Sequence, residues 1–163
     1  MKKVSSSVEN KQTLEKLKNF DLLKDLSNKE LKQISNLLIE RPYKAGEIVY
    51  KINYPHTVLY FVAEGEIKIF LEKDGEEIEL IRKKKNEHFG EVGLFLEMNR
   101  TASARAEEPS LLLAMTKKEF HEFIDIYPKI GVKILKAVSS FLCRIMIMSN
   151  EKITKSQDQS NES

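Results

Sequence analysis

Residues 46–116 consist of short apolar segments separated by turn residues, and this pattern limits the possible folds more than any other feature of the chain. The segments are rich in β-branched, aromatic or small residues, and Asp74-Gly75 is a strong hairpin signal. We predict strands at residues 48–50, 58–63, 67–72, 77–82, 103–106 and 111–115. Short strands at such regular spacing are typical of a sandwich or barrel rather than a parallel sheet with crossovers.

Apolar residues at helical spacing precede this region. They recur through residues 14–26, and Ser27 with Glu30 forms a capping box, which predicts a helix that starts at Asn28. We predict that this helix ends at Arg41-Pro42, because the residue before a proline is disfavoured in helical geometry. A pair of N-terminal helices should therefore pack on one side of the strands.

Helices also follow the strands. Thr116 and Glu119 form a second capping box, and a long amphipathic helix is predicted over residues 129–150. The end of this helix is apolar nearly all round, which suggests a partner, a ligand or a second subunit. Within residues 67–72, one set of alternating residues (Ile67, Ile69 and Leu71) is apolar and the other is Lys68, Phe70 and Glu72, which predicts a half-buried strand.

The composition indicates one soluble domain at residues 14–150, with polar, disordered tails at 1–13 and 151–163. A net charge of +2, from 27 basic and 25 acidic residues, argues against a general nucleic-acid binder. The single Cys143 permits no internal disulfide, which fits a reducing compartment. No apolar run approaches the length of a membrane span and no signal peptide is visible, so we expect a cytoplasmic protein.

The stretch 89–106, FGEVGLFLEMNRTASARA, contains groups that suit a phosphate and a hydroxyl-bearing ring. Gly90 and Gly93 allow close backbone approach or a positive φ. Glu91 supplies only acceptors, whereas Arg100 supplies a planar fork of donors that suits phosphate. Small residues on either side of the arginine leave space beside it.

Each of these residues also has a simpler interpretation. Glu91 and Arg100 could form a surface ion pair, and Gly90 and Gly93 could be ordinary turn glycines. The combination of all four with the small residues after Arg100 leads us to favour a ligand site.

Other kinds of site are not indicated. His56, His88 and His121 are dispersed without metal-ligand spacing, so we predict no metal site. The sequence contains no GxxxxGK[ST], GxSxG, HExxH or CxxC motif, so we predict no enzymatic activity. A cupin-type enzyme would need clustered histidine and glutamate ligands, which the scattered histidines do not supply.

The order Phe-Gly-Glu, a small residue, Leu and then Arg-Thr-Ala-Ser resembles the phosphate-binding cassette of cyclic nucleotide-binding domains. Such domains occur in kinase regulatory subunits, gated channels and the bacterial catabolite activator family. The likeness covers roughly residues 15–150, with departures at Asn86, where glycine is common, and at Asn99, where proline is common. It implies an α+β fold: an antiparallel β-roll of jelly-roll type, a double-stranded β-helix, flanked by N-terminal helices and a long C-terminal helix.

The resemblance also implies a ligand, cAMP or cGMP, and a set of contacts to it. By that likeness Arg100 neutralises the cyclic phosphate, backbone N–H groups of residues 90–94 add donors, and Glu91 accepts the ribose 2′-hydroxyl. The implied cassette residues are Phe89, Gly90, Glu91, Val92, Gly93, Leu94, Arg100, Thr101 and Ala102. We favour cAMP, although a threonine at the position of Thr101 can favour guanine in the family.

The long helix is expected to close over the purine, about a hinge near Tyr127-Pro128. Likeness to the lid of the catabolite activator places Ser149 and Asn150 at the base. A homodimer seam through residues 129–150 is an equally open interpretation. The transcription-factor relatives continue with a helix-turn-helix domain, whereas only residues 151–163 follow here. We therefore expect a sensor without a DNA-binding or other output domain, which acts on an unidentified protein effector. The alternative is a ligand-independent dimerisation module.

Overall fold

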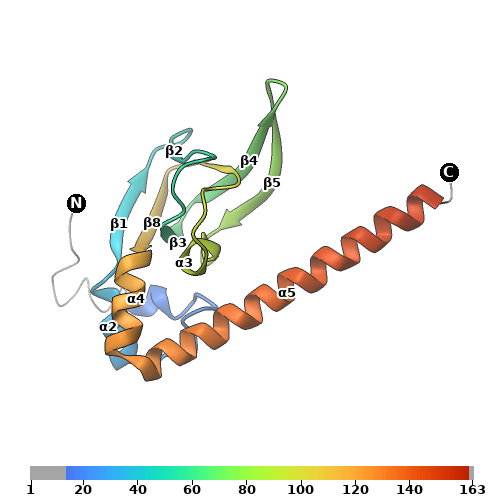
Figure 1. Ribbon diagram of the computed structural model, residues 1–163. Coiled ribbons are helices and arrows are strands. Elements are labelled where there is room, and N and C mark those ends of the chain that lie inside the picture. Colours follow the sequence, from blue (N-terminus) through green and yellow to red (C-terminus); the bar gives the residue numbers. More distant parts are fainter. Residues whose placement is uncertain (1–13, 162–163) are drawn as a thin grey trace.

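The computed structural model describes residues 14–161, which form a β-roll with helices on one side and one long helix that extends away from it (Figure 1). A helical turn at residues 14–17 comes first. The other elements are α2 (Asn28–Ser35), β1 (Ile39–Tyr43), β2 (Ile48–Tyr50), β3 (Val58–Glu64), β4 (Glu66–Lys73), β5 (Glu76–Lys84), β6 (His88–Phe89), α3 (Val92–Phe95), β7 (Ser103–Ala106), β8 (Ser110–Thr116), α4 (Lys117–Ile126) and α5 (Pro128–Asn161).

The strands form two four-stranded antiparallel sheets, with the orders β1-β8-β3-β6 and β2-β7-β4-β5. Side chains from both sheets meet inside the roll, where the small residues Ala104 and Ala106 are fully buried. The rest of this core is Tyr60, Val62, Ile67, Phe89, Leu112 and Ala114. The predicted antiparallel β-roll with flanking helices is therefore confirmed.

A second core joins the helices to the outer face of the β1-β8-β3-β6 sheet. It buries Phe20 and Phe61, whose ring centroids lie 5.0 Å apart. Ile130, Ile134 and Val138 add the inner face of α5 to this core. Both predicted capping boxes, at the starts of α2 and α4, are present.

The segment that ends at Arg41-Pro42 is a strand, not the end of a helix as predicted. Helix α2 ends at Ser35, and β1 pairs with β8 so that Pro42 lies opposite Leu111. Strand β1 is at the edge of its sheet, where a proline without an N–H is tolerated. The pairing with β8 is distant in the sequence, so local helical spacing did not predict it.

The predicted alternation in β4 is also wrong in part. The pairing register with β5 shifts between Ile69 and Phe70, which marks a bulge. As a result Ile67 and Phe70 are buried, at 0% and 1% exposure, whereas Leu71 is not.

Helix α5 is longer than predicted. It runs to Asn161, past the predicted end near Asn150, so residues 151–161 continue the helix instead of forming a disordered tail. That stretch contains no proline or glycine and several good helix formers. The predicted tail at residues 1–13 lies outside the described residues. Among the described helices, none combines the length and apolar character that a membrane span requires.

Candidate functional site

The phosphate-cassette candidate lies on the chain segment that connects the two sheets and runs from β6 through α3 to β7. Backbone hydrogen bonds tie its second half to the loop before β3. Arg100 N–H donates to the carbonyl of Tyr54 (2.7 Å), and Asn53 N–H donates to the carbonyl of Arg100 (2.9 Å). His56 N–H donates to the carbonyl of Met98 (3.2 Å). The position of Arg100 is thus set by contacts with residues more than forty positions earlier in the chain.

The side chain of Arg100 is buried, with 3% of its surface exposed. Its Nη2 donates to the carbonyl of Val58 (2.8 Å), and its guanidinium carbon lies 3.9 Å from the ring centroid of Tyr50 and 5.7 Å from that of Tyr60. Burial lowers the pKa of the guanidinium, but an arginine remains charged at neutral pH. The site therefore holds a desolvated cation on an aromatic wall.

The two glycines of the cassette are required by their surroundings. Gly90 has a φ of +91°, and a Cβ there would lie 2.6 Å from the carbonyl oxygen of Val58 and 2.9 Å from Nη1 of Arg100. At Gly93 a Cβ would overlap the backbone carbonyl and the imidazole ring of His56. Any larger residue would displace the groups that surround Arg100.

Glu91 is also buried, with 8% of its surface exposed. Burial alone would raise the pKa of this carboxyl, but His88, the Glu91 amide and Lys83 together hold the pKa below its ordinary value. Nδ1 of His88 lies 3.5 Å from Oε2 of Glu91, which is too far for a good hydrogen bond. Glu91 is therefore an ionised acceptor at neutral pH.

Unpartnered polar atoms gather at this one place. Within residues 14–151, the buried side-chain nitrogen and oxygen atoms without a hydrogen-bond partner are His56 Nδ1 and Nε2, His88 Nδ1, Glu91 Oε2, and Arg100 Nε and Nη1. Buried polar groups in folded proteins are almost always paired, so a cluster of exceptions calls for an explanation. A polar ligand with both hydrogen-bond acceptors and donors would pair with these atoms.

The structure brings some predicted cassette residues together and separates others. Gly90, Glu91, Gly93 and Arg100 converge, as described above. Phe89 instead packs inside the roll, with its ring stacked on Tyr60 at 5.1 Å.

Leu94, Val92, Thr101 and Ala102 complete the predicted cassette. The side chain of Leu94 is fully buried in the helix-side core, and its N–H donates to the carbonyl of Glu91 (3.0 Å). Leu94 is thus not the open donor that was predicted. Val92 is half-buried on α3, Thr101 is exposed and Ala102 is buried next to Arg100.

Ser149 and Asn150 are not brought to the cassette in this arrangement. Both are exposed, and the C-terminal part of α5, red in Figure 1, extends away from α3 and the roll. The physical reason is that the buried side chains of α5, Ile130, Ile134 and Val138, all lie near its start.

Four side chains of the site were not predicted from the sequence: Tyr50, Tyr60, His56 and His88. The tyrosines come from β2 and β3, which belong to different sheets, so no sequence spacing connects them with Arg100. His56 was considered only as a metal ligand. Burial and the charge of Arg100 lower its pKa to about 4, so it is neutral at pH 7. His88 directly precedes the Phe-Gly-Glu motif, and that adjacency could have indicated its role.

The arrangement suits binding rather than catalysis. It combines a buried cation with open donors, a carboxylate with an open acceptor, and aromatic rings. In the part of the chain that the structure describes, no group of three or more His, Cys, Asp or Glu side chains could hold a metal ion.

Known proteins share this architecture. The cyclic nucleotide-binding domain family matches residues 40–127. The cAMP-dependent protein kinase type II regulatory subunit of Drosophila melanogaster is 30% identical over 92 residues, which are 56% of this chain and 24% of that protein. Glutaminase 2 of Bradyrhizobium diazoefficiens is 26% identical over 132 residues, 81% of this chain and 20% of that protein. This chain therefore spans about a fifth to a quarter of the length of these curated relatives.

A solved structure gives the same result for the fold. The catabolite activator protein of Thermus thermophilus superimposes with a TM-score of 0.73 at 25% identity, over 82% of this chain and 61% of that one.

Proposed function

The chain belongs to the family of cyclic nucleotide-binding domains, and we propose that it binds a cyclic purine nucleotide, cAMP in preference to cGMP, as a regulatory module. Arg100 pairs with the cyclic phosphate and Glu91 accepts the ribose 2′-hydroxyl. The bound nucleotide changes the position of α5, and an unidentified protein effector reads that change.

The observation that carries this proposal is the set of open polar atoms on Arg100 and Glu91. A buried monoanion is unfavourable unless it is paired, and Arg100 presents a cation with two unpartnered nitrogens, Nε and Nη1. Hydrogen bonds to charged groups contribute roughly 1.5–3 kcal/mol each. The open Oε2 of Glu91 supplies the acceptor that a ribose hydroxyl needs. A cyclic nucleotide carries both groups at a fixed separation.

The preference for cAMP is supported by the likeness to bacterial regulators and to a cAMP-dependent kinase subunit. Thr101 is exposed directly after Arg100, so its hydroxyl can turn toward the ligand and is the feature that would favour cGMP. The purine itself needs a cover. We propose that residues 129–150 of α5 supply it when α5 swings about Tyr127, where α4 ends and α5 begins. In that closed state Ser149 and Asn150 would meet the base.

Titration calorimetry with cAMP, cGMP and c-di-GMP tests this proposal. We expect one cAMP per chain, weaker cGMP binding and no heat with c-di-GMP, which lacks the single small cyclic phosphate. Saturation at about 100 times the Kd should raise the free energy of unfolding by about 2.7 kcal/mol, seen as a higher Tm. Absence of both heat and a Tm shift with either cyclic mononucleotide would refute the proposal.

The exposed apolar side chains of α5 favour a second role, association of two copies. Leu142, Ile145, Met146, Ile147 and Met148 are between 37% and 59% exposed. Sedimentation of the wild type and of an Ile147→Glu variant tests this role. A dimer that this substitution dissociates, in a protein that binds no nucleotide, would favour the ligand-independent dimerisation module.

A further inference from the structure

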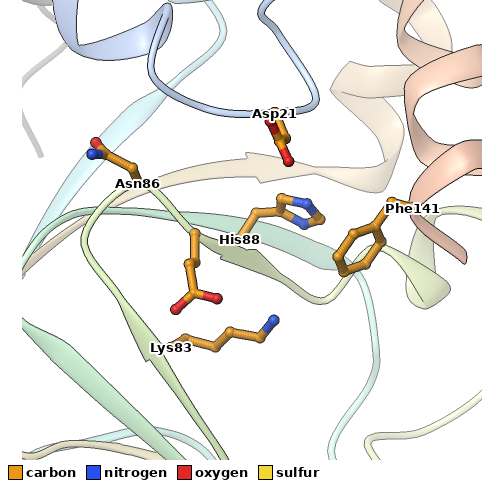
Figure 2. Close-up of a pocket in the computed structure, with 6 residues that line it drawn as sticks. Asp21, Lys83, Asn86, His88 and Phe141 are labelled. Carbon is orange, nitrogen blue, oxygen red and sulfur yellow. The ribbon is translucent and has the colours of Figure 1, made fainter. Parts of the chain in front are cut away.

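His88 lies between the carboxylate of Glu91 and helix α5. On one side its Nδ1 is 3.5 Å from Oε2 of Glu91. On the other side its ring meets Phe141 edge-on, with 4.4 Å between ring centroids and 61° between ring planes. Figure 2 shows these two rings next to each other, His88 from β6 and Phe141 from α5.

Lys83 makes a second link between the same two elements. It is 8% exposed, and its Nζ lies 5.6 Å from the centroid of the Phe141 ring. Figure 2 shows its ammonium pointing toward that ring, in a small pocket that Asp21, Asn86 and Glu87 also line. The charge of Lys83, like the imidazole of His88, stabilises the ionised form of Glu91. Phe141 therefore lies against both side chains that favour the ionised form of Glu91.

We propose that His88 is a positioning residue, which orients Glu91 for the ribose 2′-hydroxyl only while Phe141 of α5 packs on its ring. The proposal rests on the proposed function, because it names what sets selectivity for ribose at the same site.

The geometry explains why Phe141 is needed. Oε2 of Glu91 has no hydrogen-bond partner, and Nδ1 of His88 lies 3.5 Å from it. The ring of His88 is held between Phe141 at 4.4 Å and Phe61 at 6.4 Å, and only Phe141 belongs to a helix at the edge of the roll. When α5 moves away from the roll, His88 loses its contact with Phe141 and Glu91 loses its orientation.

A purely structural role for His88 fits less well. Its Nδ1 is buried without a hydrogen-bond partner, which an apolar aromatic residue would avoid. The arrangement also predicts reciprocity. If the position of α5 changes the affinity for the 2′-hydroxyl, the 2′-hydroxyl must change the docking of α5 by the same factor.

The first experiment measures ribose selectivity, the ratio of the Kd of 2′-deoxy-cAMP to that of cAMP, by calorimetry. A nucleotide without the 2′-hydroxyl leaves the buried acceptor of Glu91 unpaired, so we expect a ratio of about ten or more in the wild type. We expect the ratio to fall at least fivefold in His88→Phe and in Phe141→Ala. Leu135→Ala is the matched control, since Leu135 is a half-buried residue of α5 packed on the helix-side core, and it should leave the ratio unchanged.

A loss of stability would weaken binding of both nucleotides equally and leave the ratio constant. A wild-type ratio in Phe141→Ala would therefore overturn the proposal. If His88→Phe does not fold, His88→Gln replaces it in the same measurement. The glutamine amide can still approach Glu91 but cannot pack on Phe141 as a ring does. We expect an intermediate ratio from it.

The second experiment needs no nucleotide. The Glu91 carboxyl is titrated by carbon NMR in the ligand-free wild type and in the variants. We expect its pKa to rise in His88→Phe and in Phe141→Ala but not in Leu135→Ala. An unchanged Glu91 pKa in Phe141→Ala overturns the link to α5 even if the wild type binds no cyclic nucleotide. Failure of binding alone refutes only the proposed function.

Discussion

The guanidinium of Arg100 lies on the ring of Tyr50, 3.9 Å from its centroid, inside the β-roll. A cation on an aromatic face is stabilised when it is desolvated, by about 2 kcal/mol. The contact fixes the guanidinium against the ring, while its Nε and Nη1 have no hydrogen-bond partner. The cation is therefore placed in advance for an anionic ligand.

Arg100→Met should abolish useful binding and leave the fold intact. Removal of one partner of a buried charge pair costs about 2–5 kcal/mol, or some 30- to 4,000-fold in affinity. The ligand-free Tm should stay within about 4 °C of the wild type, because the lost hydrogen bond to Val58 is offset by removal of a desolvated cation. Calorimetry and thermal unfolding measure both.

Arg105→Met is the control for that variant. Arg105 lies on β7, the strand that follows Arg100, and pairs with Glu77 of β5 away from the cassette, so its loss should not change the affinity. Wild-type affinity in folded Arg100→Met would contradict the assignment of the phosphate contact.

Gly90→Ala should destabilise the protein and weaken nucleotide binding at least tenfold. The positive φ strains any residue with a Cβ by roughly 1–2 kcal/mol, and at Gly90 the added carbon also meets Val58 and Arg100. Gly46→Ala is the matched control, because Gly46 has a φ of +81° with no other group within 4 Å. Urea unfolding should show a larger loss for Gly90→Ala than for Gly46→Ala. Equal losses would mean that the site tolerates the extra carbon.

Stability should decrease as the pH falls from about 6.5 to about 4, in part because of His56. Its pKa is about 4 in the folded protein, against 6.5 for an ordinary histidine. Over this range the unfolded state binds more protons than the native state, so the free energy of unfolding falls with pH. Urea unfolding of the wild type and His56→Gln over this range measures the effect. The decrease should be shallower in the variant, and parallel curves would exclude His56 as a cause.

Cyclic nucleotide should protect residues 129–150 from hydrogen exchange as well as residues 89–102. A ligand that only fills the cassette would protect the second segment alone, whereas closure of α5 over the purine protects both. The ligand can drive closure only through a higher affinity for the closed state. Exchange measured by mass spectrometry, with and without cAMP, distinguishes these outcomes. No change in 129–150 would refute the lid.

Local features of the fold were predictable from the sequence. The capping boxes at Ser27 and Thr116 and the Asp74-Gly75 hairpin were predicted correctly, because each depends on interactions within a few residues. Strand β1 and the end of α5 were not. Pro42 looked like a helix stop, and only the pairing of β1 with β8 makes it part of an edge strand.

The cassette motif of residues 89–106 by itself determined the family and singled out Arg100, Glu91 and the two glycines. Only the tertiary structure decided what surrounds them. Closure of the roll places the ring centroids of Tyr50 and Tyr60, which come from different sheets, 6.1 Å apart. Arg100 packs on both rings. Phe141 reaches His88 because the first part of α5 packs on the helix-side core. Such contacts join residues that are tens of positions apart in the sequence, so they depend on chain packing, which no local pattern encodes.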